Sequence, residues 1–321
     1  MPSMEHAQPI TDAKTYFKEA SWGRVYEDVF VDDRRCSTRP NTNRKREPAC
    51  GEDYNVLKAF TAALKLRPNE EGKLVLKKRV KVLELFCGEN HSGSRAIREL
   101  IANPEKLDII TVDINSKCNP TIVADIRDWN PLSVLRPGEV TFMWCSPPCP
   151  DYSPAKTTAP RDLKTADEIA KATIRLILLL KPEAWVIENP TGLLRTREFM
   201  IPFLRFLKPT SYCKFKFKYR KDTDVFTNIP CFLPHCRLDK CKYKLENGVH
   251  EEGAQRGRSR NGTPGNSTET LHRVPHGLVQ TLFLHAFEKG RNDPADYSSE
   301  SMADHERETF EVHFPSLDFA A

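Results

Sequence analysis

The sequence predicts an α/β fold in which a mostly parallel sheet carries helices on both faces. Short runs rich in Val, Ile and Phe alternate along the chain with segments of helical spacing. These runs lack the two-residue alternation of a strand with one face in water. Each strand is therefore expected to be buried on both faces, as in parallel sheets covered by helices.

The first predicted unit is a strand, a turn and a helix. VKVLELF (80–86) is a mainly apolar run, and a turn that contains a glycine follows it. In SRAIREL (94–100), the apolar residues then have helical spacing. LDIITVDI gives a second buried strand, which ends at Asp113, and TIVADI (121–126) gives a third.

The later elements follow the same pattern. The runs predict a strand at 139–145, a long helix at 166–180, a strand at 184–190 and one or two further strands after Pro209. A last helix is expected over 273–290, with Pro275 in its first turn and Gly290 as its end.

These patterns divide the chain into four regions. Residues 1–75 form an N-terminal extension with an amphipathic helix, on which Tyr54, Leu57, Phe60 and Leu64 share one stripe. A central domain covers 76–226 and 273–290. Between its parts, 227–272 is a small irregular region, and 245–270 within it is expected to be a mobile loop. Residues 291–321 form an acidic tail that we expect to be disordered.

Composition indicates a soluble globular protein without a membrane partner. The 321 residues are 39% hydrophobic and 29% charged, with no apolar run of membrane-spanning length and no apolar core of a signal peptide. We expect an intracellular protein, in the nucleus if the host is eukaryotic and otherwise in the cytoplasm, with its ten cysteines reduced. The net charge of +5 and three basic runs suggest a polyanionic partner, although each run is also consistent with a solvated surface.

The unusual residues fall at one edge of the predicted sheet. In open α/β sheets, ligands bind at the carboxyl ends of the strands. The turn at Phe86 and Gly88, the acids Asp113 and Asp125, the segment WCSPPC and the pair Glu188-Asn189 all follow predicted strands.

Three of these features suggest an adenosine cofactor. A glycine turn before a helix offers backbone amides to a ligand. Asp113, at the end of the next strand, is placed to accept hydrogen bonds from both hydroxyls of a ribose, and Asp125 to accept one from an exocyclic amine. The sequence contains no GxxxxGK[ST] loop, which argues against an NTPase.

The segment WCSPPCPDYS (144–153) contains a candidate nucleophile. Its two prolines form a rigid, non-helical lead-in to Cys149. A thiol held on such a loop near cations and amides can have the lowered pKa that nucleophilic catalysis needs. Cys145 ends a buried strand and is interpreted as a small core residue.

Several of these motifs, in this order along the chain, resemble those of the cytosine-C5 DNA methyltransferases. PPCPDYS resembles the Pro-Cys motif of that family and IENP its Glu-Asn signature. LFCG resembles the cofactor loop, TVDI and ADI the second and third motifs, and VPHGLVQTLF the final helix. The similarity covers about residues 80–195 and 273–285. It implies a Rossmann-like S-adenosylmethionine-dependent fold, with 76–226 and 273–290 as the catalytic domain and 227–272 as a small target-recognition region.

The resemblance implies a role for each matching residue. Cys149 would add to C6 of cytosine, Glu188 would share a proton at N3 and Asn189 would orient the loop, while Arg220 is a candidate for O2. Because a base inside a duplex cannot be reached, the target cytosine of DNA would be flipped out. The cofactor positions carried over are Phe86, Gly88, Asp113, Ile114, Asp125, Ile126, Pro148 and Val274.

The chain departs from the family pattern in three places. Its cofactor loop lacks the tight second glycine, the Gln-x-Arg-x-Arg strand is not visible, and the target-recognition region is short. These departures suggest a divergent, viral or phage-like member. They leave open an RNA cytosine target of the transfer-RNA type, or a catalytically silent nucleic-acid-binding protein with the same fold. Methylation of an exocyclic amine is disfavoured, since its motif needs an aromatic residue where this chain has Cys149.

A zinc site is also considered. Cys231, Cys236 and Cys241 lie near His235 and His250, but the four-residue gaps are wider than those of most structural zinc motifs. The sequence analysis therefore assigns no metal ligand.

Overall fold

A seven-stranded mixed sheet forms the centre of the computed structural model, which describes residues 73–157, 159–236, 241–257 and 262–287. The strand order is β3-β2-β1-β4-β5-β7-β6. The pairings β3-β2, β2-β1, β1-β4 and β4-β5 are parallel, whereas β7 runs antiparallel to both β5 and β6. The predicted α/β fold with a mostly parallel sheet is confirmed. Along the chain, the strands are β1 (Val80–Leu85), β2 (Leu107–Asp113), β3 (Ile122–Val123), β4 (Phe142–Cys145), β5 (Ala184–Pro190), β6 (Leu207–Ser211) and β7 (Asp222–Thr227).

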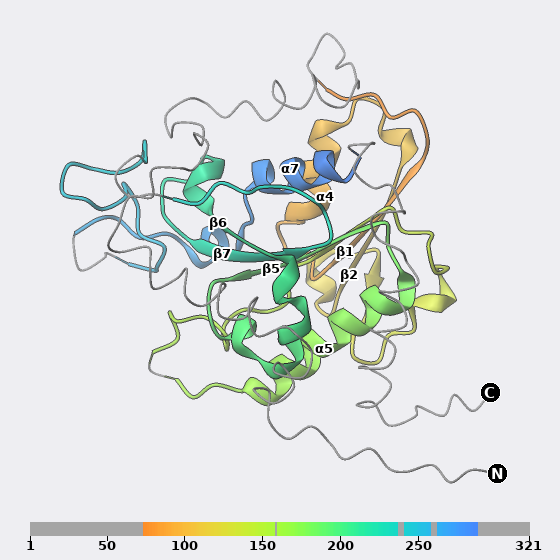
Figure 1. Cartoon of the computed structure of the whole chain (residues 1–321), viewed down its shortest axis with the longest axis horizontal. Helices are drawn as coiled ribbons and strands as arrows, with labels where there is room; N and C mark the ends of the chain where they lie inside the picture. The colour runs from red at the N-terminus through yellow and green to blue at the C-terminus, as the bar shows by residue number, and fades with distance from the viewer. Residues whose placement is uncertain (1–72, 158, 237–240, 258–261, 288–321) are drawn as a thin grey trace.

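Helices cover both faces of this sheet (Figure 1). The α-helices are α4 (Ser92–Leu100), α5 (Leu163–Leu180), α6 (Thr268–His272) and α7 (His276–Ala286). Short 3₁₀ helices join the elements: η1 (Pro104–Lys106), η2 (Ser116–Cys118), η3 (Pro131–Ser133), η4 (Leu193–Thr196), η5 (Glu198–Phe206) and η6 (Tyr212–Phe215). In Figure 1, α4 and α7 lie on one face and α5 on the other.

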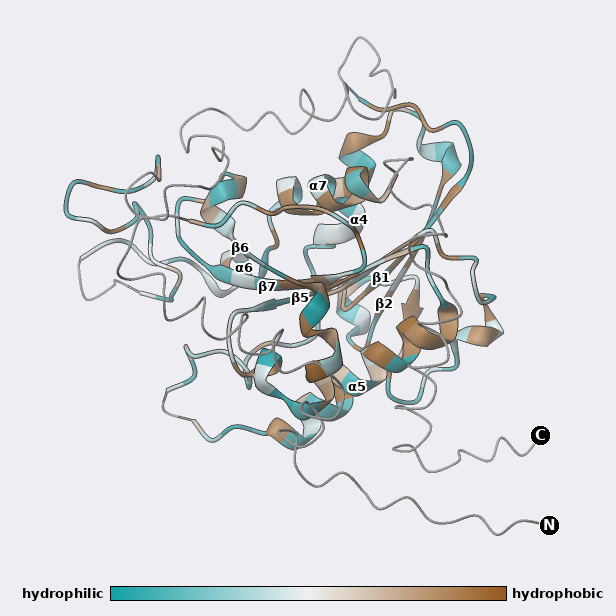
Figure 2. Ribbon diagram, viewed as in Figure 1, coloured by the Kyte–Doolittle hydropathy of each residue, from teal (hydrophilic) through white to brown (hydrophobic). Residues whose placement is uncertain are grey.

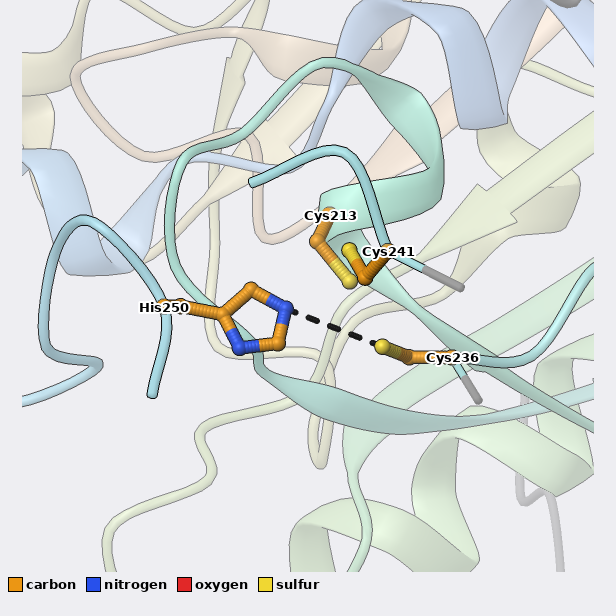
Figure 3. Close-up of side chains that lie close together, drawn as sticks. All are labelled: Cys213, Cys236, Cys241 and His250. Carbon is orange, nitrogen blue, oxygen red and sulfur yellow. Dashed lines mark hydrogen bonds between the residues drawn. The ribbon is translucent and has the colours of Figure 1, made fainter. Parts of the chain in front are cut away.

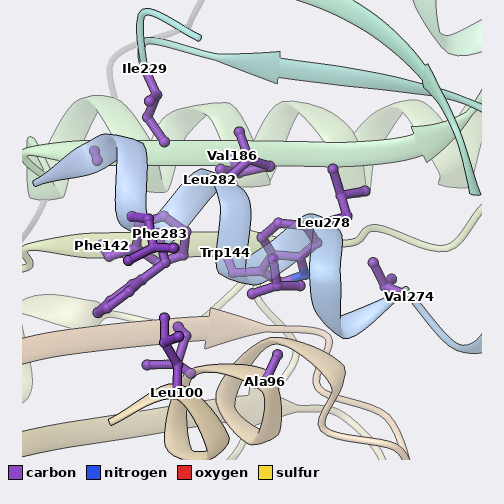
Figure 4. Packing of buried hydrophobic residues seen from close by; sticks show 14 of the residues in the cluster. Ala96, Leu100, Phe142, Trp144, Val186, Ile229, Val274, Leu278, Leu282 and Phe283 are labelled. Atoms are coloured by element: carbon purple, nitrogen blue, oxygen red, sulfur yellow. The ribbon is translucent and has the colours of Figure 1, made fainter. Parts of the chain in front are cut away.

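The core has two halves, one on each face, because alternate strand residues point to opposite sides. On the first face, α4 and α7 pack on Val82, Phe142 and Trp144 (Figure 4). On the second face, α5 packs on Leu83 and Met143 among other apolar side chains. In Figure 2, brown stretches along α5 and the central strands mark the apolar sequence of these elements.

Local sequence explains where the long helix begins and ends. The side chain of Asp162 accepts a hydrogen bond from the backbone N–H of Thr165 at 3.1 Å, which caps the first turn of α5. The helix ends at Lys181, which adopts the left-handed conformation and donates its backbone N–H to Ile177.

The structure corrects several predicted boundaries. The third strand is only Ile122–Val123, so Asp125 lies in the following turn, where its carboxylate accepts a hydrogen bond from the backbone N–H of Arg127. Pro275 precedes the last helix, which begins at His276. The predicted amphipathic helix, the end at Gly290 and the acidic tail lie outside the described residues. Within the described ranges, no helix combines the length and apolar character needed to cross a membrane.

We predict that Phe283→Ala strongly destabilises the protein. The ring of Phe283 is 1% exposed and meets Phe142 edge-on at 5.3 Å between centroids, so its loss leaves a cavity between α7 and the sheet. The free energy of unfolding should fall by about 3–5 kcal/mol in urea titrations. Phe232→Ala is the matched control: that ring is 65% exposed, and its removal should change stability by only about 0.5 kcal/mol. Equal losses in the two variants would contradict this packing.

Candidate functional site

The turn after β1 and the end of β2 are joined by Asp113. Gly88, in the left-handed region with φ of 54°, donates its backbone N–H to Asp113 Oδ2 at 2.9 Å. Asn115 donates its backbone N–H to Oδ1 of the same carboxylate at 2.8 Å. Phe86, with φ of 60°, begins this turn. One carboxylate thus fixes the two turns that were predicted to hold an adenosine cofactor.

The neighbouring cofactor candidates differ in accessibility. Ile114 is 66% exposed directly after Asp113, whereas Ile126 is buried. The carboxylate of Asp125 accepts hydrogen bonds from the guanidinium of Arg127, at 3.0 Å from Nε to Oδ2, and this bond holds its pKa below the usual range.

Glu84 anchors the helix that follows the turn, and the sequence analysis did not identify it. Its two carboxylate oxygens accept the backbone N–H groups of Gly93 at 2.8 Å and Ser94 at 2.9 Å, in the first turn of α4. Burial raises the pKa of this carboxyl, while these hydrogen bonds oppose the rise. A Cβ on Gly93 would lie 2.8 Å from Glu84 Oε1, so this position requires a glycine. The sequence did contain a signal for this role: Glu84 is the one acidic residue in the apolar run 80–86, which a glycine turn follows.

Val274 joins the end of the chain to the same turn. Its backbone N–H donates to Ser92 Oγ at 3.2 Å, at the start of α4. The residue itself is buried in the core between α7 and the sheet. This hydrogen bond places Val274, one of the carried-over cofactor positions, beside the start of α4.

The loop after β4 holds Cys149 through backbone contacts. The carbonyl of Cys149 accepts hydrogen bonds from the N–H groups of Tyr152 at 3.1 Å and Ser153 at 2.9 Å. Pro147, buried, accepts a hydrogen bond through its carbonyl from Nδ2 of Asn189 at 3.0 Å. Pro148 is exposed and Cys149 half-buried, so the thiol loop reaches the surface while its base is locked to β5.

A second contact joins this loop to the segment after β5. Leu193 donates its backbone N–H to the carbonyl of Tyr152 at 2.9 Å. A Cβ on Gly192 would lie 2.3 Å from that same carbonyl oxygen. The two backbones are therefore packed so closely that only glycine fits at this position.

Glu188 lies in the wall of the site, on the neighbouring strand. It is 4% exposed, and the hydroxyl of Tyr212 donates a hydrogen bond to its Oε1 at 2.8 Å. Burial, together with the charge of Glu188, raises the pKa of Tyr212 well above its ordinary value, which keeps that hydroxyl protonated as a donor. Sequence reasoning missed Tyr212, because it comes from η6 beyond the parallel part of the sheet.

The charges around Cys149 come from two other elements. Burial raises the pKa of the Cys149 thiol, the positive charge of Lys221 lowers it and the negative charge of Glu188 raises it. Lys221 is held by a hydrogen bond from its Nζ to the carbonyl of Leu271 at 3.0 Å, and by its position over the ring of Tyr212 at 4.7 Å. The thiol, the carboxylate and an ammonium group therefore share one site.

Arg220, the predicted partner of cytosine O2, has a different neighbour. Its Nε donates to Asp222 Oδ1 at 2.9 Å, and its NH2 group lies 2.6 Å from Oδ2. Its role in a site stays a prediction. Lys221, next to it in the sequence, is the cation that acts on the thiol, and the sequence analysis did not single it out.

A separate cluster contains four metal-ligating side chains: Cys213, Cys236, Cys241 and His250. All four are buried, and their ligand atoms lie within 4.8 Å of one another. The three thiols interact: the hydrogen bond from Cys213 lowers the pKa of Cys236, while the pKa values of Cys213 and Cys241 are raised. Of the residues weighed for zinc from the sequence, Cys231 and His235 lie outside this cluster; His235 faces Asp222 at 3.7 Å.

Comparison with known proteins shows similarity to a viral protein over 63% of this chain. The chain is 26% identical over 227 residues to a Frog virus 3 (isolate Goorha) protein named "Probable DNA (cytosine-5)-methyltransferase", a match that spans 63% of this chain and 98% of that protein. No protein-family model matches the chain.

Solved structures give weaker similarity. The S. pombe Dnmt2 methyltransferase matches with 18% identity and a TM-score of 0.34, over 46% of this chain and 50% of that one. A Spodoptera frugiperda DNMT2 mutant matches with 15% identity and a TM-score of 0.35, over 49% and 55%. The chain thus spans about half the length of each of these two structures.

The resemblance predicted from the motifs is confirmed by the viral relative. That relative is named for the activity of the family whose motifs this chain resembles. In this chain the Pro-Cys motif lies in the loop after β4, and the Glu-Asn motif lies on the adjacent parallel strand β5.

Proposed function

We propose that this protein transfers a methyl group from S-adenosylmethionine to C5 of cytosine in DNA, through a covalent bond between Cys149 and C6. One observation carries the proposal. The thiol of Cys149 lies in the loop after β4, and Glu188 lies on the neighbouring parallel strand β5. The hydrogen bond from Asn189 of β5 to Pro147 joins that loop to the strand, and the charge of Glu188 acts on the thiol.

The residues at the cofactor edge fit S-adenosylmethionine. The Asp113 carboxylate accepts only one backbone N–H at each oxygen, so lone pairs remain for ribose hydroxyls. Exposed Ile114 offers an apolar surface for an adenine ring, and a Cβ at Gly88 would meet nothing within 4 Å, which indicates open space at the turn. When bound, this cofactor supplies an electrophilic methyl group on its sulfonium. Phe86, Asp125, Ile126, Pro148 and Val274 complete the proposed cofactor site.

The chain's own residues account for the activation of cytosine. C5 is a poor nucleophile until the thiolate of Cys149 forms a bond to C6, which moves the electrons of the C5–C6 double bond toward C5 and the N3–O2 side of the ring. Glu188 stabilises that charge by sharing a proton at N3, and Tyr212 holds the carboxyl group in place. After C5 is methylated, loss of its proton restores the double bond and releases the thiolate.

Lys221 is the cation that we assign to the thiolate. It lowers the pKa of Cys149, whereas Arg220 is bound to Asp222. Because burial keeps the pKa of the thiol high, the compensating charge of Lys221 promotes ionisation where the nucleophile needs it. The proposed role of Arg220 at cytosine O2 would require it to leave Asp222.

DNA is proposed as the substrate because the viral relative is named for DNA methylation. We propose 227–272 as the target-recognition region. It packs beside the site: Tyr219 donates its hydroxyl to the carbonyl of Thr270 at 3.2 Å, and Lys221 binds Leu271. A flipped-out cytosine would meet Cys149 between this region and the thiol loop.

The proposal predicts that the wild-type protein forms a covalent adduct with DNA containing 5-fluorocytosine when S-adenosylmethionine is present. Fluorine at C5 cannot leave as a proton does, so the enzyme stays attached at C6. The adduct is detected by denaturing electrophoresis and mass spectrometry. Cys149→Ser should form no adduct. Cys231 is a half-buried cysteine outside both the thiol loop and the cluster of Cys213, Cys236, Cys241 and His250, so Cys231→Ser should form the adduct normally.

The same experiment separates the alternatives. An adduct with 5-fluorocytosine RNA but not with DNA would establish the RNA alternative. If neither substrate is trapped by a protein that binds the cofactor, the chain is a catalytically silent member of the fold. An undiminished adduct from Cys149→Ser would show that another group is the nucleophile.

A second prediction concerns the pH dependence of the thiol. The alkylation rate of Cys149 by iodoacetamide, followed by mass spectrometry, should rise with pH around a midpoint above the ordinary value of 9.0, because burial raises its pKa. Removing a negative neighbour favours the thiolate, so Glu188→Gln should lower the midpoint. Lys221→Gln removes a positive neighbour and should raise it. Arg220→Gln is the control; if it shifts the midpoint and Lys221→Gln does not, the assignment of the cation is reversed.

A third prediction concerns the cofactor. Asp113→Asn should weaken S-adenosylmethionine binding by about 10- to 100-fold in calorimetric titrations, because a charged acceptor of the ribose hydroxyls is lost. Asp108→Asn, on the same strand and paired with Lys81 at 3.1 Å, should bind the cofactor as wild type does. Similar affinities for the two variants would place the ribose elsewhere.

A further inference from the structure

Three separate segments meet at the cluster of Cys213, Cys236, Cys241 and His250 (Figure 3). Cys213 belongs to η6, Cys236 follows β7, and the other two residues belong to the irregular region after it. In Figure 3 the three thiols and the imidazole converge on one point. Convergence of four potential ligands from distant parts of a chain is the arrangement of a structural metal site.

The distances match tetrahedral coordination by zinc. With zinc–sulfur bonds of about 2.3 Å and zinc–nitrogen bonds of about 2.05 Å, a tetrahedron separates S from N by about 3.6 Å and two sulfurs by about 3.8 Å. Sγ of Cys236 lies 3.6 Å from Nε2 of His250. The ligand atoms all lie within 4.8 Å of one another, so the widest pair need close by only about 1 Å to meet an ion.

Ile229 and Leu233 at the start of the irregular region pack into the main core, but the apolar cluster around the four ligands is small. The hydrophobic cluster here consists of Cys213, Cys236 and Cys241, with Tyr243 packed against them. Between β7 and α6, the described residues form no helix or strand longer than an isolated bridge. A region with so small an apolar core is typical of those that a bound metal holds folded.

We infer that Cys213, Cys236, Cys241 and His250 bind one structural zinc ion. Three thiolates and an imidazole complete a four-coordinate shell, which leaves no position for a substrate or water and gives the ion a structural role. Thiolate ligands select zinc over magnesium or calcium, and the imidazole distinguishes the site from the usual four-cysteine iron–sulfur cluster. This inference does not depend on the proposed reaction.

The site would also connect the irregular region to the wall of the catalytic site. Cys213 follows Tyr212, whose hydroxyl binds Glu188. The backbone N–H of Cys236 donates to Ser211 Oγ at 3.0 Å, on the residue before Tyr212. An ion that holds Cys236 and Cys213 together therefore stabilises the segment that positions Glu188.

The test is the metal content of the full-length protein, measured by plasma mass spectrometry after purification without added metal. Wild type should contain about one zinc ion per chain. Cys213→Ser and His250→Asn should each lose it. Cys231→Ser and His235→Asn, which change the same residue types nearby but outside the cluster, should retain it. Loss from the control variants rather than from Cys213→Ser would overturn the ligand set.

Cobalt substitution of the wild-type protein keeps the inference testable if a variant fails to fold. The zinc-depleted protein, given Co²⁺ alone, should show the sulfur-to-cobalt charge-transfer absorption and strong visible bands of a tetrahedral thiolate site. A wild-type protein that contains no zinc and gives only the weak spectrum of octahedral Co²⁺ would refute the site. Binding of S-adenosylmethionine by the same sample is measured separately. It tests the proposed function independently of the zinc site.

Discussion

The parallel pairing of β4 with β5 is the constraint on which the site depends. Cys145, the last residue of β4, pairs with Ile187, so the loop that follows β4 leaves the sheet beside Glu188 and Asn189 of β5. The side chain of Asn189 then joins the second strand to the loop of the first through Pro147. These backbone and amide contacts bring Cys149 and Glu188 together, although the two residues are far apart in the sequence. No direct contact between their side chains is needed.

The antiparallel hairpin β6–β7 adds the other half of the site. Because β7 pairs with β5, the segment between the two hairpin strands returns across the end of β5 and carries Tyr212 and Lys221 to Glu188 and Cys149. The hairpin is itself fixed by the ion pair between Asp224, 1% exposed, and Arg195. Removal of one partner of such a buried pair leaves the other charge unpaired, which strongly destabilises the fold.

The sheet and the edge that carries the candidate site follow from the sequence, because buried parallel strands are continuous apolar runs and their ends are marked by polar residues. Asp113 and Glu188 could be placed for that reason. Tyr212 and Lys221 could not, since their approach depends on how an antiparallel hairpin folds back, which no local pattern encodes. The length of strand β3 was overestimated because Asp125, inside the apolar run, forms a local turn in which its carboxylate accepts the backbone N–H of Arg127 two residues later. His250 was assigned to a mobile loop, yet it is buried, because its imidazole lies against the thiol of Cys236, outside that loop.

The close packing at Gly192 has a consequence for how this protein can diverge. The thiol loop and the segment after β5 meet backbone to backbone, and the contact depends on the absence of a single Cβ. Side chains around the two loops can therefore change without altering the distance between the main chains that carry Cys149 and Glu188. The spacing of the reactive groups therefore depends on a position where a single hydrogen atom stands in place of a side chain.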